Sequence, residues 1–163
     1  MKKWPWYIVS VVFIALDQAS KYWAVSVLLP YQPEAILPML NLTLAYNSGA
    51  AFSFLSGTGD WHRWFFTAFS GIMSLVLVVW IVRLPETARL QLTAVSLILA
   101  GALGNLMDRI FLGHVIDFID VYYAHYHWPV FNVADCAICI GSFLLFLDLC
   151  LQAKRAPLID STE

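Results

Sequence analysis

Charged residues are scarce in this chain. Asp, Glu, Lys and Arg make up 12% of its 163 residues, which is about half of the roughly 25% usual in soluble domains. The formal net charge of −2 provides no basic surface for a polyanion, so no nucleic-acid partner is expected. Hydrophobic residues reach 61%, more than a soluble domain of this size could hide from water. Together these values exclude soluble globular and disordered proteins and indicate an integral membrane protein.

The motifs of several enzyme classes are also missing. No phosphate-binding loop, dinucleotide fingerprint or Gly-x-Ser-x-Gly elbow occurs in the sequence. Cys136, Cys139 and Cys150 lie in one apolar run, and their odd number argues against a disulfide framework, so we expect them to be packing residues. The pair His125-x-His127 is only a weak metal signal. We therefore expect neither a metal nor another cofactor.

Four apolar runs are long enough to cross a bilayer, which takes about 20 residues of helix. They cover about residues 5–29, 64–82, 90–108 and 130–151. The first run lacks the small-residue cleavage site of a signal peptide, so we interpret it as an uncleaved span. The sequence thus predicts an all-α membrane fold, a bundle of four transmembrane helices, in a single domain over residues 1–163.

The basic residues between the runs predict an orientation, because Lys and Arg favour the cytoplasmic side. One side would hold Lys2, Lys3, Arg83, Arg89, Lys154 and Arg155. Both termini are therefore expected in the cytoplasm, and two larger segments, about residues 30–62 and 110–131, on the opposite side.

Strands are expected in both of these outer segments. Residues 40–55 begin with period-2 alternation, and residues 115–131 are rich in aromatic and β-branched side chains. Asn47-Ser48-Gly49 has the composition of a turn. We expect a small extracytoplasmic β-sheet or cradle that rests on the bundle at the headgroup level, where Trp and Tyr are favoured.

Polar residues inside the spans are candidate functional residues, because a charge there costs at least about 2.5–3.5 kcal/mol on insertion scales. Asp17 and Lys21 can pair on one helix face, either as an interior ion pair or facing a substrate. Gly101, Asn105 and Arg109 recur every four residues. This stripe fits ordinary helix packing and equally fits a site for a peptide backbone or a carboxylate. We interpret the neighbouring Asp108 as a surface counter-ion of Arg109.

Carboxylates near the outer interface suggest the chemistry. Asp117 and Asp120 lie in the second outer segment, and Asp135 follows Asn132 by one turn. Asn132 is a reasonable N-cap, and Asp135 could have a cap-like role. Two aspartates that share a water, one ionised and one protonated, can hydrolyse a peptide bond. The residues alone do not decide which two meet, and a small transporter or a structural membrane adaptor remains an alternative. Asp148, at the far end of its span, is given no role.

Five motifs in order resemble those of lipoprotein signal peptidases, the signal peptidase II family of bacterial inner membranes. They are Asp17-Gln-Ala-Ser-Lys21, Asn47-Ser-Gly-Ala-Ala-Phe52, Gly101-Ala-Leu-Gly-Asn-Leu-Met-Asp-Arg109, Val115-Ile-Asp-Phe-Ile-Asp120 and Phe131-Asn-Val-Ala-Asp135. The resemblance implies an aspartic endopeptidase that cleaves the signal peptide from diacylglyceryl-modified prolipoproteins, just before the lipidated cysteine. It implies that Asp117 and Asp135 form the catalytic dyad.

The resemblance also implies a surrounding set of substrate-binding residues. These are Asp17, Lys21, Asn47, Gly49, Gly101, Asn105, Arg109, Asn132 and Ala134. The implied partners are diacylglyceryl-prolipoproteins, membrane lipids and inhibitors of the globomycin type. The implied location is the bacterial inner (cytoplasmic) membrane, as a multi-pass protein with its active site near the periplasmic face.

Overall fold

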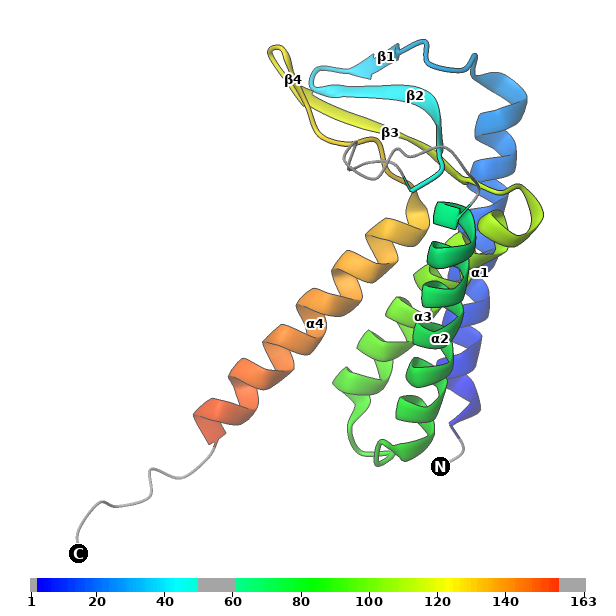
Figure 1. The fold of residues 1–163 in the computed structure, drawn as a ribbon. Helices are drawn as coiled ribbons and strands as arrows, with labels where there is room; N and C mark the ends of the chain where they lie inside the picture. Colours follow the sequence, from blue (N-terminus) through cyan, green and yellow to red (C-terminus); the bar gives the residue numbers. More distant parts are fainter. Residues whose placement is uncertain (1–2, 50–60, 156–163) are drawn as a thin grey trace, which may run out of the picture.

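The fold combines four helices with a small antiparallel sheet (Figure 1). A computed structural model describes residues 3–49 and 61–155. In chain order the elements are α1 (Trp4–Val27), β1 (Glu34–Leu37), β2 (Leu40–Asn47), α2 (Trp61–Arg83), α3 (Arg89–Phe111), β3 (Val115–Tyr123), β4 (Tyr126–His127) and α4 (Val133–Arg155). This architecture confirms the predicted four-helix membrane bundle with a small sheet.

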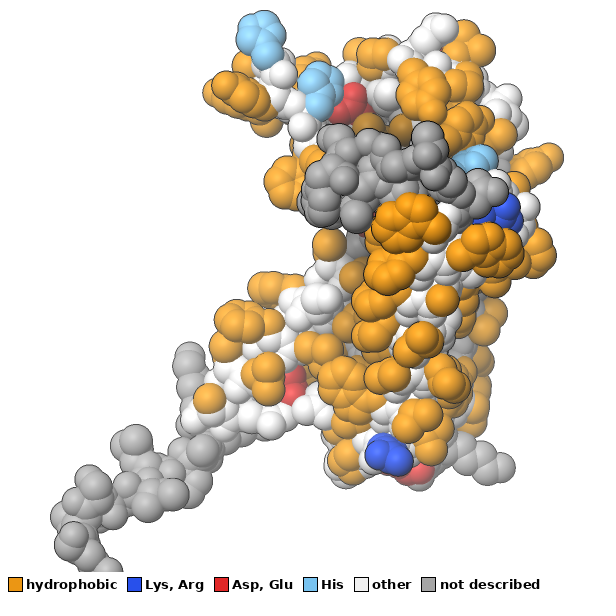
Figure 2. Space-filling view, viewed as in Figure 1, with side chains coloured by type: hydrophobic (Ala, Val, Ile, Leu, Met, Phe, Trp, Pro, Cys, Tyr) orange, Lys and Arg blue, Asp and Glu red, His pale blue; other side chains and the backbone are white. Residues whose placement is uncertain are grey.

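The helices contain stretches long and apolar enough to cross a membrane. These stretches are Trp4–Val27, Arg63–Arg83, Arg89–Phe111 and Val133–Ala153. Apolar side chains cover the outer surfaces of α2 and α4 (Figure 2), as expected where lipid replaces water. The fourth helix begins at Val133 and not near residue 130, because Asn132 caps its first turn.

Helix α3 is the most buried of the four spans, and α1, α2 and α4 pack around it. One apolar core joins α2 to α3 through Leu77, Ile81, Leu92, Val95 and Leu99. Glycines allow α4 to approach α3 closely, since a Cβ at Gly141 would lie 2.6 Å from the carbonyl oxygen of Ala94. A Cβ at Gly101 would overlap the carbonyl oxygen of Ala134. The packing interpretation of Gly101 therefore accounts for its position.

The sheet has the strand order β1-β2-β3-β4 and lies across the end of the bundle opposite the start of α1 and the end of α4 (Figure 1). Strand β2 pairs with β3 so that Ala45 faces Asp117 and Asn41 faces Asp120. Strand β1 was not predicted. It is a four-residue edge strand with every residue exposed, so no alternation between a buried and an exposed face marks it in the sequence.

The predicted turn ends β2. Gly49 has a φ of +93°, which glycine adopts readily, and its amide donates a hydrogen bond of 2.9 Å to Oδ1 of Asn47. The continuation of the predicted strand region into residues 50–55 lies outside the described residues. A second apolar core of Ala24, Leu28, Leu44, Ile116 and Phe118 joins β2 and β3 to the end of α1. The sheet is thereby fixed to the bundle at the level where β3, α3 and α4 meet.

The close α3–α4 contact predicts different effects of alanine at two helix glycines. Gly141→Ala should lower the temperature of thermal unfolding in detergent, because the new methyl group meets a backbone carbonyl and overpacking costs about 1–3 kcal/mol. Gly71→Ala is the matched control, because nothing lies within 4 Å of its added Cβ and alanine gains helix propensity of about 1 kcal/mol. Equal or higher stability of Gly141→Ala would contradict the close contact.

Candidate active site

Two aspartates meet at the junction of the sheet and the bundle. Asp117 lies on β3 and is buried, whereas Asp135 lies in the first turn of α4 and is half-buried. Both carboxyl groups lie beside Asn132, the residue immediately before α4. The structure therefore brings together the two aspartates that the family resemblance selects.

Asn132 contacts both aspartates. Its Nδ2 donates to Oδ1 of Asp117 at 2.6 Å, and its Oδ1 accepts the backbone N–H of Asp135 at 2.9 Å. In return, the backbone N–H of Asn132 donates to Oδ2 of Asp135 at 3.2 Å. This reciprocal pair is a capping box with Asp in the third helical position, and it confirms the predicted cap. One fully buried side chain thus starts α4 and positions the carboxyl groups of both aspartates.

Each remaining carboxylate oxygen also accepts a hydrogen bond from an asparagine. Nδ2 of Asn47 donates to Oδ2 of Asp117 at 3.0 Å, and Nδ2 of Asn105 donates to Oδ1 of Asp135 at 2.8 Å. These bonds fix the rotation of both carboxyl groups. Each carboxylate oxygen has a second lone pair, which can accept a hydrogen bond from a water or a substrate.

The pKa of Asp117 is raised to about 6. Burial is the largest cause, and the negative charge of Asp135 adds to it, while hydrogen bonds from Asn47 and Asn132 act in the opposite direction. A neighbouring carboxylate and a low-dielectric environment both favour the protonated form. Asp117 can therefore hold a proton at a pH where an ordinary aspartate is almost fully ionised.

A buried ion cluster lies directly beneath the aspartates. Nζ of Lys21 lies 2.8 Å from Oδ2 of Asp17 and 2.8 Å from Oδ2 of Asp108. It also donates to Oδ1 of Asn105 at 2.9 Å, so its three N–H groups are all used. The predicted Asp17–Lys21 pair is confirmed as an interior ion pair. A direct role of these two residues in binding substrate stays a prediction.

The interpretation of Asp108 as a surface counter-ion is wrong. Its side chain is 2% exposed and pairs with Lys21, and its Oδ2 also accepts the backbone N–H of Ile116 at 3.2 Å. The residues at 101, 104, 105 and 108 are all buried on α3, which is the spacing of one helix face. This spacing in the sequence indicates that Asp108 faces inward. A stripe that takes only every fourth residue, 101, 105 and 109, leaves Asp108 out.

The ion cluster connects the elements that carry the site. Oδ1 of Asp17 accepts the backbone N–H of Ala134 at 2.8 Å, in the first turn of α4. Asp108 holds β3 through the amide of Ile116, and Lys21 reaches Asp135 through the side chain of Asn105. Gly104 provides room, since a Cβ there would lie 2.6 Å from Oδ2 of Asp17.

Arg109 and Gly49 lie at the edge of the site. The Arg109 guanidinium lies over the ring of Phe66, 5.7 Å from its centroid, and its charge interacts with those of Asp135 and Asp117. Gly49 is buried, and a Cβ on it would overlap the same Phe66 ring. Helix α2 therefore supports both the turn after β2 and the arginine.

Asp120 and Asp148 lie away from the two aspartates of the site. Oδ1 of Asp120 lies 2.8 Å from Nδ1 of His127, and its Oδ2 accepts hydrogen bonds from Asn41 and Thr43. Burial raises the pKa of Asp120, but these three hydrogen bonds outweigh it and hold the pKa below its ordinary value. Asp148 accepts a hydrogen bond of 2.6 Å from Gln91, near the other end of the bundle.

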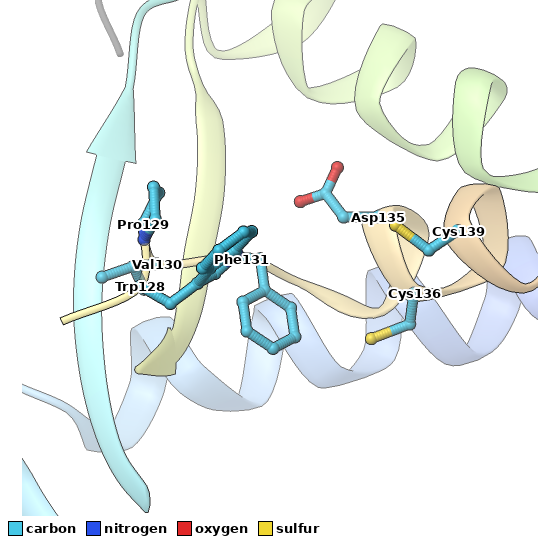
Figure 3. A pocket seen from close by; sticks show the side chains of 7 residues that line it. All are labelled: Trp128, Pro129, Val130, Phe131, Asp135, Cys136 and Cys139. Atoms are coloured by element: carbon cyan, nitrogen blue, oxygen red, sulfur yellow. The ribbon is translucent and has the colours of Figure 1, made fainter. Parts of the chain in front are cut away.

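Two pockets open beside the aspartates. The larger, of about 380 Å³, is lined by Trp128, Pro129, Val130, Phe131, Asp135, Cys136 and Cys139 (Figure 3). The other, of about 290 Å³, is lined by Ala45, Tyr46, Asn47, Ser48, Asp117, Pro129 and Val130. Trp128, Phe131 and the cysteines were not predicted as site residues, because apolar side chains in a membrane protein carry no distinguishing pattern.

This arrangement suits hydrolysis by two carboxylates. One of them has a pKa near neutrality, and a half-buried partner lies close enough to influence it. Among residues 3–49 and 61–155, no group of three or more His, Cys, Asp or Glu side chains could hold a metal ion. The polar groups assembled here are those that an aspartic hydrolase requires.

Comparison with known proteins identifies a family. Residues 9–151 match the family model described as signal peptidase (SPase) II. The chain is 48% identical over 155 residues to the lipoprotein signal peptidase of Hydrogenovibrio crunogenus, covering 94% of this chain and 90% of that protein. It is 50% identical over 153 residues to the lipoprotein signal peptidase of Acinetobacter baumannii, covering 93% of this chain and 86% of that protein.

Solved structures agree with these sequence relatives. A bacterial membrane enzyme determined by the in meso method at 2.3 Å resolution superposes with a TM-score of 0.82 at 30% identity, covering 97% of this chain and 94% of that one. A second, determined by the same method at 1.9 Å resolution, gives a TM-score of 0.79 at 32% identity, with coverage of 96% and 94%.

Loss of the buried cation should destabilise the protein. In Lys21→Met, Asp17 and Asp108 lose their shared cation, and breaking a buried ion pair costs about 3–5 kcal/mol. We expect a clear fall in the thermal unfolding temperature in detergent. Arg89→Met, which removes an exposed cation at the start of α3, should change it little. Similar stability of the two variants would show that the cluster does not hold the site together.

Proposed function

The chain belongs to the signal peptidase II family, and from this we propose that Asp117 and Asp135 are the catalytic dyad with which it hydrolyses its substrates. Members of this family are membrane aspartic endopeptidases that remove signal peptides from prolipoproteins during lipoprotein maturation, and that is the function of this protein. The transporter and adaptor alternatives are therefore set aside. The observation that best supports the dyad is the contact of Asn132 with both carboxyl groups.

The two aspartates have different roles in this proposal. Asp117 holds the proton, because burial and its neighbour raise its pKa to about 6. Asp135 acts as the base, because it lies in the first turn of α4, where the positive end of the helix dipole favours a carboxylate. The pair then contains one acid and one base at the same site.

Hydrolysis follows from this difference. Asp135 takes a proton from the bound water while the water oxygen attacks the scissile carbonyl carbon, and Asp117 donates its proton to the carbonyl oxygen. The resulting tetrahedral diol collapses as Asp135 returns its proton to the departing nitrogen and Asp117 recovers a proton from one hydroxyl. The products are a carboxylic acid and an amine, and no covalent bond to the enzyme is formed.

The proposed substrate is a prolipoprotein with a diacylglyceryl-modified cysteine, cut just before that cysteine. A lipid-anchored cysteine keeps the scissile bond near the membrane interface, which is the depth of a dyad at the junction of sheet and helices. The backbone from Ala45 to Ser48 borders Asp117 and can take up the extended peptide by strand addition. A cyclic peptide of the globomycin type would block the same two pockets.

The remaining substrate-binding assignments follow from position. Asn47, Asn105, Asn132 and Ala134 act by holding the dyad or the start of α4. Gly49 and Gly101 allow close approach of neighbouring elements. Arg109 is available at the edge of the site to bind a carbonyl of the substrate, while Asp17 and Lys21 act on the substrate through the residues they position.

Substitution of single aspartates tests the dyad. Asp117→Asn and Asp135→Asn should each lose at least about 10²–10⁴-fold in cleavage of a lipidated prolipoprotein, because acid–base transfer is lost while size is kept. Both variants should still insert and still bind a globomycin-like ligand. Asp120→Asn should lose less, and Asp148→Asn should match the parent, because their partners lie away from the site. If Asp120→Asn were inactive and Asp117→Asn cleaved normally, the assignment of Asp117 to the dyad would be wrong.

The pH dependence of cleavage tests which aspartate holds the proton. Because the active form has Asp117 protonated, kcat/KM should fall as the pH rises through about 6. Asp120→Asn should leave the midpoint of this decline unchanged, since Asp120 contacts neither dyad residue through the hydrogen bonds described. A rise of kcat/KM through the same range would reverse the acid and base assignments.

The proposed orientation places both termini in the cytoplasm and the sheet on the periplasmic side of the inner membrane. Arg83 and Arg89 flank the α2–α3 connection, at the end of the bundle opposite the sheet (Figure 1), which fits the preference of basic residues for the cytoplasm. A reporter fused after Arg155 should be cytoplasmic, and one fused near residue 58 should be periplasmic. A periplasmic reporter after Arg155 would overturn this orientation.

A further inference from the structure

We infer that the apolar pocket beside Asp135 binds an acyl chain of the substrate's diacylglyceryl group, and that Cys136 and Cys139 form its wall on α4. The inference rests on the proposed dyad and specifies where one part of its substrate lies. The two cysteines, expected from the sequence to be packing residues, thereby gain a function.

The chemistry of the pocket fits a hydrocarbon chain. Its volume of about 380 Å³ lies within the range of roughly 300–1,000 Å³ common for small-molecule sites. The lining is apolar except for one charged group, the carboxylate of Asp135. Trp128 and Phe131 stand opposite this carboxylate, and Cys136 and Cys139 follow it on α4 (Figure 3).

The positions of the two pockets indicate how the substrate is oriented across the dyad. They share Pro129 and Val130, with Asp117 in one and Asp135 in the other. A peptide bond held between the two carboxyl groups sends the two halves of the substrate into different pockets. The pocket with Asp117 contains the polar side chains of Asn47 and Ser48, so it suits the peptide. The lipid-modified cysteine follows the cleaved bond directly, and the pocket with Asp135 offers its chains an apolar recess.

The pocket continues into the membrane surface of α4. Cys139 is exposed, and Phe143 and Phe146, one and two turns further along, are 63% and 64% exposed. An acyl chain can therefore leave the pocket past Cys139 and remain in contact with apolar side chains. Because the chain comes from hydrocarbon, its transfer into the pocket gains little from the hydrophobic effect. The benefit of the pocket is alignment of the adjacent peptide bond with the dyad.

Narrowing the pocket tests this assignment. Cys139→Trp places an indole at its membrane opening, and Cys150→Trp is the matched control, an exposed position on the same helix outside the pocket. Two substrates would share one peptide and carry either dipalmitoyl or dibutanoyl glyceryl groups. We expect Cys139→Trp to lower kcat/KM about tenfold or more for the long chains only, the size of effect that shape discrimination in an apolar pocket gives. Cys150→Trp should change neither rate.

A second measurement fills the pocket after folding. In Cys136→Ala/Cys150→Ala enzyme, the Cys139 thiolate attacks propyl methanethiosulfonate, a propyl disulfide forms and methanesulfinate leaves. Cleavage of the long-chain substrate should fall and should recover when dithiothreitol reduces the disulfide. This reversal excludes misfolding as the cause.

The remaining outcomes distinguish the possible occupants. An equal loss for both acyl lengths would overturn the inference, because the pocket would then hold signal-peptide side chains or support the dyad. No loss for either substrate would also overturn it, since the pocket would then contain only bilayer lipid. Neither result affects the dyad itself, because cleavage of the dibutanoyl substrate by the parent enzyme reports on Asp117 and Asp135 independently.

Discussion

The rest of the site depends on the hydrogen bonds that the side chain of Asn132 makes to Asp117 and to the backbone of Asp135. It has no exposed surface, so each of its polar atoms must find a partner within the protein. Its Oδ1 accepts from the amide of Asp135, and its Nδ2 faces Asp117, Asn105 and the carbonyl oxygen of Ile116. The same side chain therefore fixes the first turn of a transmembrane helix and the distance between two reactive carboxyl groups. Stability and geometry of the site have a common origin in one amide.

Beneath this amide, a buried ion cluster holds the supporting elements. Lys21 from α1 reaches Asp108 and Asn105 of α3, Asp17 reaches the first turn of α4, and Asp108 holds the start of β3. Isolated charges of this kind are unfavourable in hydrocarbon, and each becomes tolerable because the others neutralise it and satisfy its hydrogen bonds. The cluster thus joins three helices and a strand at one depth. It leaves Asp117 and Asp135 as the pair that faces the pockets.

The sequence predicts most of the fold because the bilayer imposes few solutions. Four apolar runs become four helices, and the cap at Asn132 follows from residue type and position. Strand β1 escapes prediction because it has no buried face. The prediction that Asp108 is a surface counter-ion was wrong because it considered only the adjacent Arg109. The helical spacing of Asp108 places it on the buried face of α3. The pairing of Asp117 with Asp135 required either the family resemblance or the structure, since it depends on how β3 lies against α4. The pocket formed by Trp128, Phe131, Cys136 and Cys139 has no signature in the sequence.

The most direct measurement is cleavage by Asn132→Ser enzyme. Serine caps a helix about as well as asparagine does, so the start of α4 should be kept. The shorter side chain has no Nδ2 to reach Asp117, so the two carboxyl groups lose their common support. We expect kcat to fall about 100-fold or more, the usual cost of disturbed acid–base geometry. Cleavage within a few-fold of the parent rate would contradict the claim that this amide sets the geometry of the dyad.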